Sequence, residues 1–138
     1  MRIQLNTSDI SWDRVVEILR EVQMASYTAE IHQTAFNNSQ VVVFIFDADT
    51  LIGFGRAITD GVYQAAVYDV AVWPEYQGKG VGGLILNAIL EHCPNCNVIL
   101  YASPGKETFY EKHSFRKMLT GMALFTDPAR MIEKGFIL

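Results

Sequence analysis

The sequence predicts a single α/β (α+β) domain built on a mixed β-sheet. Its 138 residues suit one compact domain, and the composition, 50% hydrophobic and 19% charged, is that of a globular protein. No internal repeat, low-complexity tract or linker-like segment divides the chain. Strand-like and helix-like patterns follow one another in the order strand, helices, three strands, helix, strand, helix, strands, which predicts helices packed on a sheet.

The first half of the chain is expected to supply a strand, two helices and a hairpin. Residues 3–5 form a short strand-like run. Residues 13–25 place apolar side chains at helical spacing behind Ser11, a suitable N-cap, and residues 29–36 form a second, shorter helical segment. A polar turn joins two apolar runs into a predicted hairpin: 41–46 and 51–58.

The second half begins with an apolar strand, residues 65–73, followed by a glycine-rich loop and an apolar helix that reaches His92. A further strand is expected over residues 97–102 and a short helix over 106–112. Residues 115–125 are rich in apolar side chains around Gly121 and are expected to add one or two strands.

Charge and hydropathy exclude two classes of partner. The net charge is −4 and the Lys and Arg residues are scattered, whereas nucleic-acid binding requires clustered cations. The longest uninterrupted apolar run, residues 41–46, falls far short of the roughly 20 residues that cross a bilayer, so no membrane association is expected. The N-terminus lacks the pattern of a secretion signal, and we expect a cytoplasmic protein.

Two cysteines, Cys93 and Cys96, follow the predicted end of a helix. Structural zinc needs four ligands, and no second Cys or His pair stands at a suitable spacing, so we expect no metal. Redox dithiols are usually found at a helix N-terminus. We therefore interpret the pair as structural thiols in a helix-to-strand turn.

The glycine-rich loop indicates a site for a phosphate-bearing ligand. Residues 77–82 contain three glycines between a strand and a helix, where unpaired N–H groups and the helix dipole attract anions. A dinucleotide fingerprint also fits the glycine spacing. It is rejected because three residues separate the strand from the loop, and the position about 20 residues later is not acidic.

Two motifs in this region resemble those of the GNAT N-acetyltransferase superfamily. The loop matches the family's acetyl-CoA signature, Gln or Arg, two residues, Gly, one residue, then Gly or Ala, over residues 77–82. Residues 109–115 match its Phe-Tyr-Glu-Lys-x-Gly-Phe segment, with Ser114 in place of glycine, and serine tolerates a left-handed conformation at modest cost. Residues 53–72 are also similar, more loosely, to a subgroup that includes plant chloroplast arylalkylamine acetyltransferases.

The resemblance implies a mixed, mostly antiparallel sheet of six to seven strands, about four flanking helices and a splayed central strand pair. It also implies acetyl-CoA as the cosubstrate. Backbone N–H groups of the loop would hold its pyrophosphate, and the strand before the loop would pair with its pantetheine arm. The cofactor-binding residues implied are Val70, Ala71, Val72, Gln77, Gly78, Lys79, Gly80, Val81 and Gly82, together with Tyr110.

The same resemblance assigns the proton donor for the departing thiolate to Tyr110. The base that deprotonates the amine stays open, because the family's usual base positions fall on Ala66 and Tyr68. Period-two alternation places Asp69 on the opposite face unless a bulge turns it inward. Asp69, Tyr68 and a water chain are the candidate bases, and a structural pairing of Asp69 with backbone or Arg56 is equally compatible with the sequence.

The function predicted is acetyl-CoA-dependent N-acetyltransfer, directly, to a primary amine of a small molecule. The alternatives are a catalytically weak acyl-CoA-binding module and a protein or peptide amine acetyltransferase. A homodimer is a further expectation, to which the apolar residues 135–138 would contribute. His32 and His113 are expected at the surface, and Tyr27, Phe36, Tyr63 and Phe125 are candidate walls of the acceptor pocket.

Overall fold

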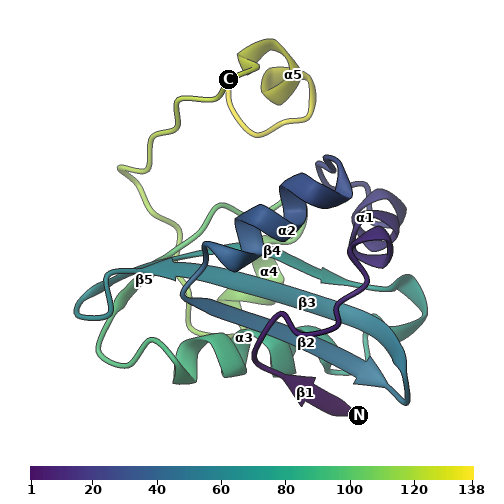
Figure 1. Ribbon diagram of the computed structural model, residues 1–138. Coiled ribbons are helices and arrows are strands. Elements are labelled where there is room, and N and C mark those ends of the chain that lie inside the picture. The colour runs from purple at the N-terminus through teal and green to yellow at the C-terminus, as the bar shows by residue number, and fades with distance from the viewer. The chain divides into compact units, whose positions relative to one another are not determined.

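The computed structural model describes residues 1–138, which fall into two compact units, residues 1–100 and 101–138. The first unit is a sheet with helices on both faces (Figure 1). Its elements in chain order are β1 (Arg2–Gln4), α1 (Trp12–Glu21), α2 (Ala29–Asn37), β2 (Val41–Asp47), β3 (Thr50–Thr59), β4 (Gln64–Val72), a 3₁₀ helix (Pro74–Tyr76), α3 (Val81–Glu91) and β5 (Asn97–Ile99). The second unit contains α4 (Glu107–Glu111) and α5 (Pro128–Glu133).

The sheet is five-stranded in the order β1-β2-β3-β4-β5. Strands β1 to β4 pair antiparallel, and β5 pairs parallel to β4. Pairing between β4 and β5 covers only Gln64–Ala66, so the rest of β4 has no neighbour on that side. This opening is the splayed strand pair that the family resemblance implies.

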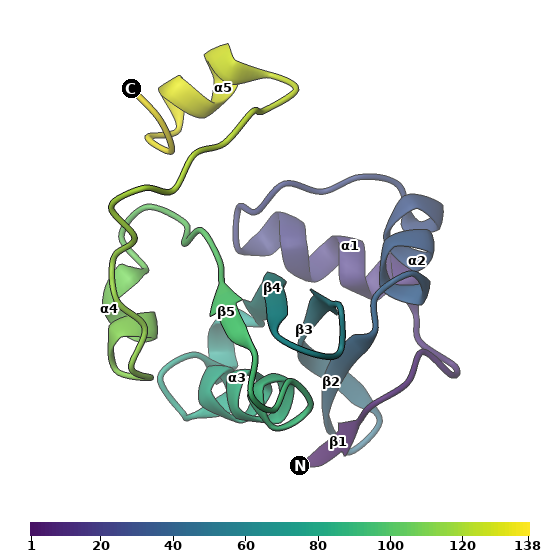
Figure 2. The same ribbon diagram turned by 90° about the vertical axis from the view of Figure 1, so that its left-hand side faces the viewer.

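Helices cover both faces of the sheet. Helices α1 and α2 lie on one face and α3 on the other, as the two views show (Figures 1 and 2). Strand β2 is buried along almost its whole length, which explains its continuous apolar sequence. Phe36 of α2 is fully buried in one core cluster with Phe44 of β2 and Phe54 of β3.

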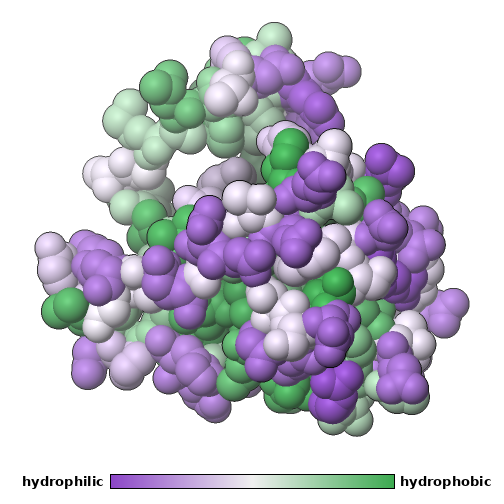
Figure 3. Space-filling view, viewed as in Figure 1, coloured by the Kyte–Doolittle hydropathy of each residue, from purple (hydrophilic) through white to green (hydrophobic).

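Helix α1 begins at an N-cap, Ser11, whose side chain accepts a hydrogen bond from the Arg14 N–H. Its buried face carries Val15, Ile18 and Leu19, and its outward surface is largely hydrophilic (Figure 3). The helix ends at Glu21, earlier than the sequence predicts, because Gln23 adopts a left-handed conformation with φ +61°.

The strands expected over residues 115–125 do not form, so that prediction is wrong. This stretch has no strand partner in the sheet order. The side chains of Leu119 and Met122 are each 98% exposed, so nothing packs against them. Strand propensity depends on neighbouring strands and burial, and it does not by itself produce a strand.

None of the helices combines the length and the apolar composition of a membrane span.

Candidate functional site

The loop after β4 turns the chain from the sheet into α3. The Trp73 N–H still donates to the Ile52 carbonyl of β3 at 2.8 Å, and the 3₁₀ helix follows. Gly78 and Gly80 then adopt left-handed conformations with φ +75° and +85°. Gly80 is the N-cap of α3, and no side chain caps the helix there. Both glycines are required by this backbone path, because other residues adopt such φ values only with strain.

The loop presents a continuous run of unused donors. The Gln77 N–H donates to the Pro74 carbonyl, but no hydrogen bond within the protein uses the N–H groups from Gly78 to Gly83. A Cβ built on Gly78 or Gly80 would meet no atom within 4 Å, so the approach to these donors is open. This run at a helix N-terminus is suited to bind an anion such as a phosphate.

Side chains fix the base of the loop. The Gln77 side-chain amide donates to the Val72 carbonyl at 2.9 Å. The Tyr76 hydroxyl donates to Asp47 at 2.5 Å, which ties the loop to the β2–β3 turn and raises the pKa of Tyr76. The Lys79 ammonium lies 5.6 Å from the centre of the Tyr76 ring. Gln77 therefore acts through its side chain, and the anion donors begin at Gly78.

The open edge of β4 lies directly before this loop. Because Trp73 bonds to β3, strand alternation directs the backbone N–H and C=O of Val72 to the open side. The bond from Gln77 to the Val72 carbonyl agrees with that direction. Ala71 pairs with Phe54 of β3, and Val70 before it belongs to a bulge, where alternation does not fix the direction of the main-chain groups. The edge therefore offers main-chain groups to an extended, amide-containing ligand.

A β-bulge interrupts β4 at Asp69 and Val70. Phe54 pairs with Ala71 and Arg56 with Tyr68, so the single residue Gly55 lies opposite both bulge residues. Asp69 has φ +57°, a conformation that aspartate tolerates better than most residues. The bulge that the sequence allowed is therefore present.

An ion pair anchors the bulge. The Arg56 guanidinium donates to the Asp69 carboxylate at 2.8 Å, and the two side chains are only 15% and 22% exposed. A second guanidinium nitrogen of Arg56 donates to the Ser39 hydroxyl at 3.2 Å. Arg56 also lies 5.2 Å from the centre of the Tyr68 ring, which brings both candidate bases into one cluster. Asp69 is thus paired with Arg56, one of the structural partners that the sequence allowed.

His32 of α2 extends this cluster and corrects the sequence prediction. It is 3% exposed, not a surface residue. Its Nε2 accepts the Tyr27 N–H at 2.8 Å, which requires that nitrogen to be unprotonated. Burial lowers the pKa of His32; the Asp69 carboxylate opposes this shift and the Arg56 charge adds to it. His32 and Phe36 occupy the same helix face, a spacing from which burial was predictable.

Gly55 connects the bulge to helix α3. A Cβ at this position would lie 2.8 Å from Ile85 and 3.1 Å from Ile89, both on α3, and 3.2 Å from Val70. The close packing of α3 on β3 therefore requires glycine. The helix that carries the donor loop and the strand that carries the bulge are fixed against each other at this contact.

Tyr110 lies in α4 of the second unit. Its ring contacts Phe109 and Phe115 at centroid distances of 4.9 and 5.8 Å. Burial raises the pKa of Tyr110, so the phenol stays protonated at neutral pH. Ser114 has φ +71°, the left-handed conformation expected where the related motif has glycine. His113 is partly buried and packs against the Phe109 ring.

The other sequence candidates divide between core and surface. Phe36 is fully buried, whereas Tyr27 and Tyr63 are 59% and 60% exposed. Phe125 packs with Tyr101 and Phe136 inside the second unit.

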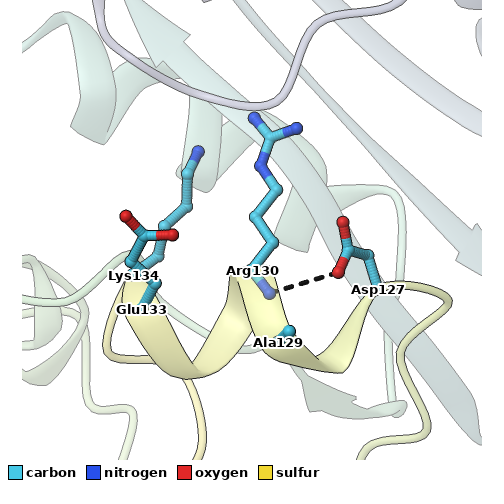
Figure 4. A pocket seen from close by; sticks show the side chains of 5 residues that line it. All are labelled: Asp127, Ala129, Arg130, Glu133 and Lys134. Carbon is cyan, nitrogen blue, oxygen red and sulfur yellow. Dashed lines mark hydrogen bonds between the residues drawn. The ribbon is translucent and has the colours of Figure 1, made fainter.

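An open pocket of about 630 Å³ lies along α5, where Asp127 caps the helix by accepting the Arg130 N–H (Figure 4). No predicted site residue lines that pocket. No cluster of three or more acidic, His or Cys side chains is arranged to hold a metal ion.

The comparison with protein families decides the assignment. Residues 7–123 match the model of the acetyltransferase (GNAT) domain. The chain belongs to the GNAT acetyltransferase family. The matched range includes both motifs and extends across the two structural units.

Individual relatives agree with this family. An uncharacterized N-acetyltransferase of Pyropia yezoensis is 30% identical over 90 residues, which cover 60% of this chain and 52% of that protein. A chloroplastic serotonin N-acetyltransferase 2 of Oryza sativa is 30% identical over 119 residues, covering 79% of this chain and 60% of that protein. The aligned residues thus span only about half to three fifths of the length of these two relatives.

Solved structures share the fold. A probable acetyltransferase of unknown function from Staphylococcus aureus superposes with a TM-score of 0.78 at 25% identity, covering 90% of this chain and 99% of that one. A GNAT family acetyltransferase from Streptococcus pneumoniae gives a TM-score of 0.74 at 23% identity, covering 91% and 98%.

Proposed function

We propose that this GNAT domain is an acetyl-CoA-dependent N-acetyltransferase that transfers the acetyl group directly to a primary amine of a small molecule. The observation that carries the proposal is the run of unused N–H donors from Gly78 to Gly83 at the start of α3. It suits the pyrophosphate of coenzyme A, because main-chain donors and the helix dipole favour a compact anion. Lys79 would add charge at the rim of the loop.

The open edge of β4 supports a place for the rest of the cosubstrate. Pantetheine contains two amide groups. The outward main-chain groups of Val72, with those of Val70 and Ala71 along the same edge, would pair with them as a neighbouring strand does. In this arrangement the Val70 N–H would polarise the thioester carbonyl. It would then hold the oxyanion of the tetrahedral intermediate.

The transfer has a simple balance of bonds and protons. The amine nitrogen attacks the thioester carbon, the new C–N bond forms, and the C–S bond breaks. The amine loses a proton, and the leaving thiolate gains one from the Tyr110 hydroxyl. The raised pKa of Tyr110 is consistent with a phenol that remains protonated until the thiolate develops.

The base that accepts the amine proton is assigned to the bulge, either to Asp69 directly or to water held beside it, with Tyr68 as the other candidate. One oxygen of Asp69 already accepts a hydrogen bond from Arg56, and this favours the water route. Its second oxygen makes no protein hydrogen bond and remains available to attract a cationic amine. A small-molecule amine is proposed over a peptide, and the two are separated by the substrate panel below.

The test combines cosubstrate binding with turnover. Calorimetric titration with coenzyme A is expected to show binding by the wild-type protein. Thiol release from acetyl-CoA should depend on an added amine from a panel of arylalkylamines, polyamines, amino acids and peptides. Tyr110→Phe should lower kcat by about 10²- to 10⁴-fold with binding unchanged, whereas Tyr63→Phe, a change at an exposed tyrosine of the β3–β4 turn, should not.

Two results would contradict the proposal. Absence of heat on titration with coenzyme A would show that the protein does not bind the proposed cosubstrate. Tight binding without amine-dependent thiol release at any pH from about 7 to 9 would instead identify an acyl-CoA-binding module.

A further inference from the structure

The four residues from Cys93 to Cys96 form a tight turn between α3 and β5. The Cys96 N–H donates to the Cys93 carbonyl at 3.3 Å, which closes the turn. Pro94 occupies the second position, where its fixed φ is favoured, and Asn95 occupies the third with φ +63°. This combination is the pattern of a type II turn, in which the third residue has a positive φ.

A turn of this kind brings its first and last residues to a Cα–Cα separation below about 7 Å. Disulfides span about 4.4–6.8 Å between Cα atoms, so the turn holds the two cysteines at a compatible separation. Both thiols are free, and the turn geometry replaces the sequence-based interpretation of the pair as structural thiols only. We propose that Cys93 and Cys96 are a redox-active dithiol, which a small-molecule disulfide oxidises reversibly to an intramolecular disulfide.

The two thiols differ in access, and this difference sets the order of reaction. Cys93 is 5% exposed, and burial, together with the nearby Cys96, raises the pKa of its thiol. Cys96 is partly exposed. Cys96 is therefore the thiol that meets an external disulfide first, and Cys93 is the resolving thiol.

Thr59 contacts the Cys96 thiol. The Thr59 hydroxyl donates its single proton to the Gln64 carbonyl at 2.7 Å. Its contact with the Cys96 sulfur, at 3.7 Å, therefore has Cys96 as the donor. This contact orients the Cys96 thiol in the reduced protein.

With oxidised glutathione as oxidant, the reaction occurs in two exchanges. The Cys96 thiolate attacks one glutathione sulfur, the S–S bond of glutathione breaks, and one glutathione thiolate leaves. The Cys93 thiolate then attacks the Cys96 sulfur and expels the second glutathione. Two protein thiols are oxidised, one glutathione disulfide is reduced to two thiols, and two protons pass from the cysteines to the glutathione thiolates.

This site is separate from the proposed acetyl-transfer residues. It lies at the C-terminal end of α3, whereas the donor loop lies at the N-terminal end. Its test needs neither acetyl-CoA nor an amine.

The experiment incubates the 138-residue protein with glutathione buffers of increasing oxidised fraction, quenches with acid and measures intact mass. The wild type is expected to lose the mass of two hydrogens and to keep no glutathione. Cys93→Ser should keep one glutathione on Cys96, because nothing resolves the mixed disulfide. Cys96→Ser should react with glutathione disulfide at roughly one tenth of the wild-type rate or slower, because the buried Cys93 reacts only after local opening.

Two further outcomes decide the case. A wild type that accumulates glutathione adducts, or that stays fully reduced in buffer that oxidises the urea-unfolded chain, would overturn the proposal. The effective concentration of the resolving thiol should be at least about tenfold higher in the native protein than in the urea-unfolded chain, because the turn holds the two cysteines together. An equal or lower native value would contradict it.

Discussion

The bulge at Asp69 lies in β4 and the donor loop at residues 78–83 follows that strand, yet the two are built from different groups of the chain. The loop offers main-chain N–H groups, and its glycines keep side chains away from them. The bulge depends on side chains: an aspartate in a left-handed conformation, its arginine partner and a buried histidine beside them. A main-chain site depends on backbone conformation and tolerates the loss of side chains. A side-chain site is instead sensitive to the loss of a side chain.

The largest expected effect comes from breaking the bulge. Asp69→Ala leaves Arg56 half-buried without its counter-charge and keeps a non-glycine residue at φ +57°. We expect the free energy of unfolding to fall by about 2–4 kcal/mol, measured by urea denaturation. Asp69→Gly removes the same carboxylate but tolerates the backbone angle, so it should lose about 1 kcal/mol less.

Asp69→Asn is the matched control for charge, since asparagine accepts both the angle and a hydrogen bond. It should be the most stable of the three variants. If Asp69→Asn were as unstable as Asp69→Ala, the charge alone would stabilise the bulge, and the argument from φ would be wrong.

The second prediction concerns the contact that joins the two regions. Gly55→Ala would place a Cβ 2.8 Å from Ile85 on α3 and 3.2 Å from Val70 in the bulge. Overpacking of this kind costs about 1–3 kcal/mol of unfolding free energy, and the displaced α3 should also weaken coenzyme A binding. Gly121→Ala, whose Cβ would lie 3.8 Å from its nearest neighbours, should leave both quantities unchanged. Loss of stability without loss of binding would show that the loop is independent of this contact.

The sequence was sufficient for features that depend on local chemistry. The glycine spacing located the loop and the polar turn located the β2–β3 hairpin. Ser114 adopts the left-handed conformation that the sequence motif allowed for it. The bulge was predicted only as a possibility, because alternation alone places Asp69 on the opposite face. What fixes it is the pairing register with β3, which depends on residues distant in sequence.

Features that depend on tertiary partners were missed. Residues 115–125 have the composition of strands, but strands require neighbours that composition does not report. His32 was assigned to the surface. Its burial depends on Phe36 one turn later and on an acceptor role toward the Tyr27 N–H. The division into two units at residue 100 was likewise not predicted, and a single domain stays a prediction.

The third prediction returns to the loop, where backbone and side chain can be separated directly. Gly80→Ala forces a side chain into φ +85° at the N-cap of α3. We expect coenzyme A affinity to fall about five- to thirtyfold, the equivalent of the 1–2 kcal/mol cost of that conformation. Lys79→Ala removes an exposed cation and should cost less than about fivefold. Calorimetry compares the two. A larger effect from Lys79→Ala would mean that side-chain charge, and not main-chain donors, holds the phosphates.

The smallest expected effect tests whether the bulge cluster depends on a neutral histidine. The pKa of His32 is lowered in the folded protein, chiefly by burial, with Arg56 adding to the shift and Asp69 opposing it. The unfolded chain therefore binds more protons below about pH 6.5, so stability is complete above that pH and falls as the solution is acidified. A protonated Nε2 also loses its ability to accept the Tyr27 N–H.

His32→Gln, which keeps an acceptor without titrating, should reduce the dependence of unfolding free energy on pH between about 5 and 7 by at most 1.4 kcal/mol per pH unit. His92 and His113 are present in both proteins, so the difference between the two pH profiles isolates His32. Parallel profiles would show that His32 has an ordinary pKa, and the bulge would then be held by the Arg56–Asp69 pair alone.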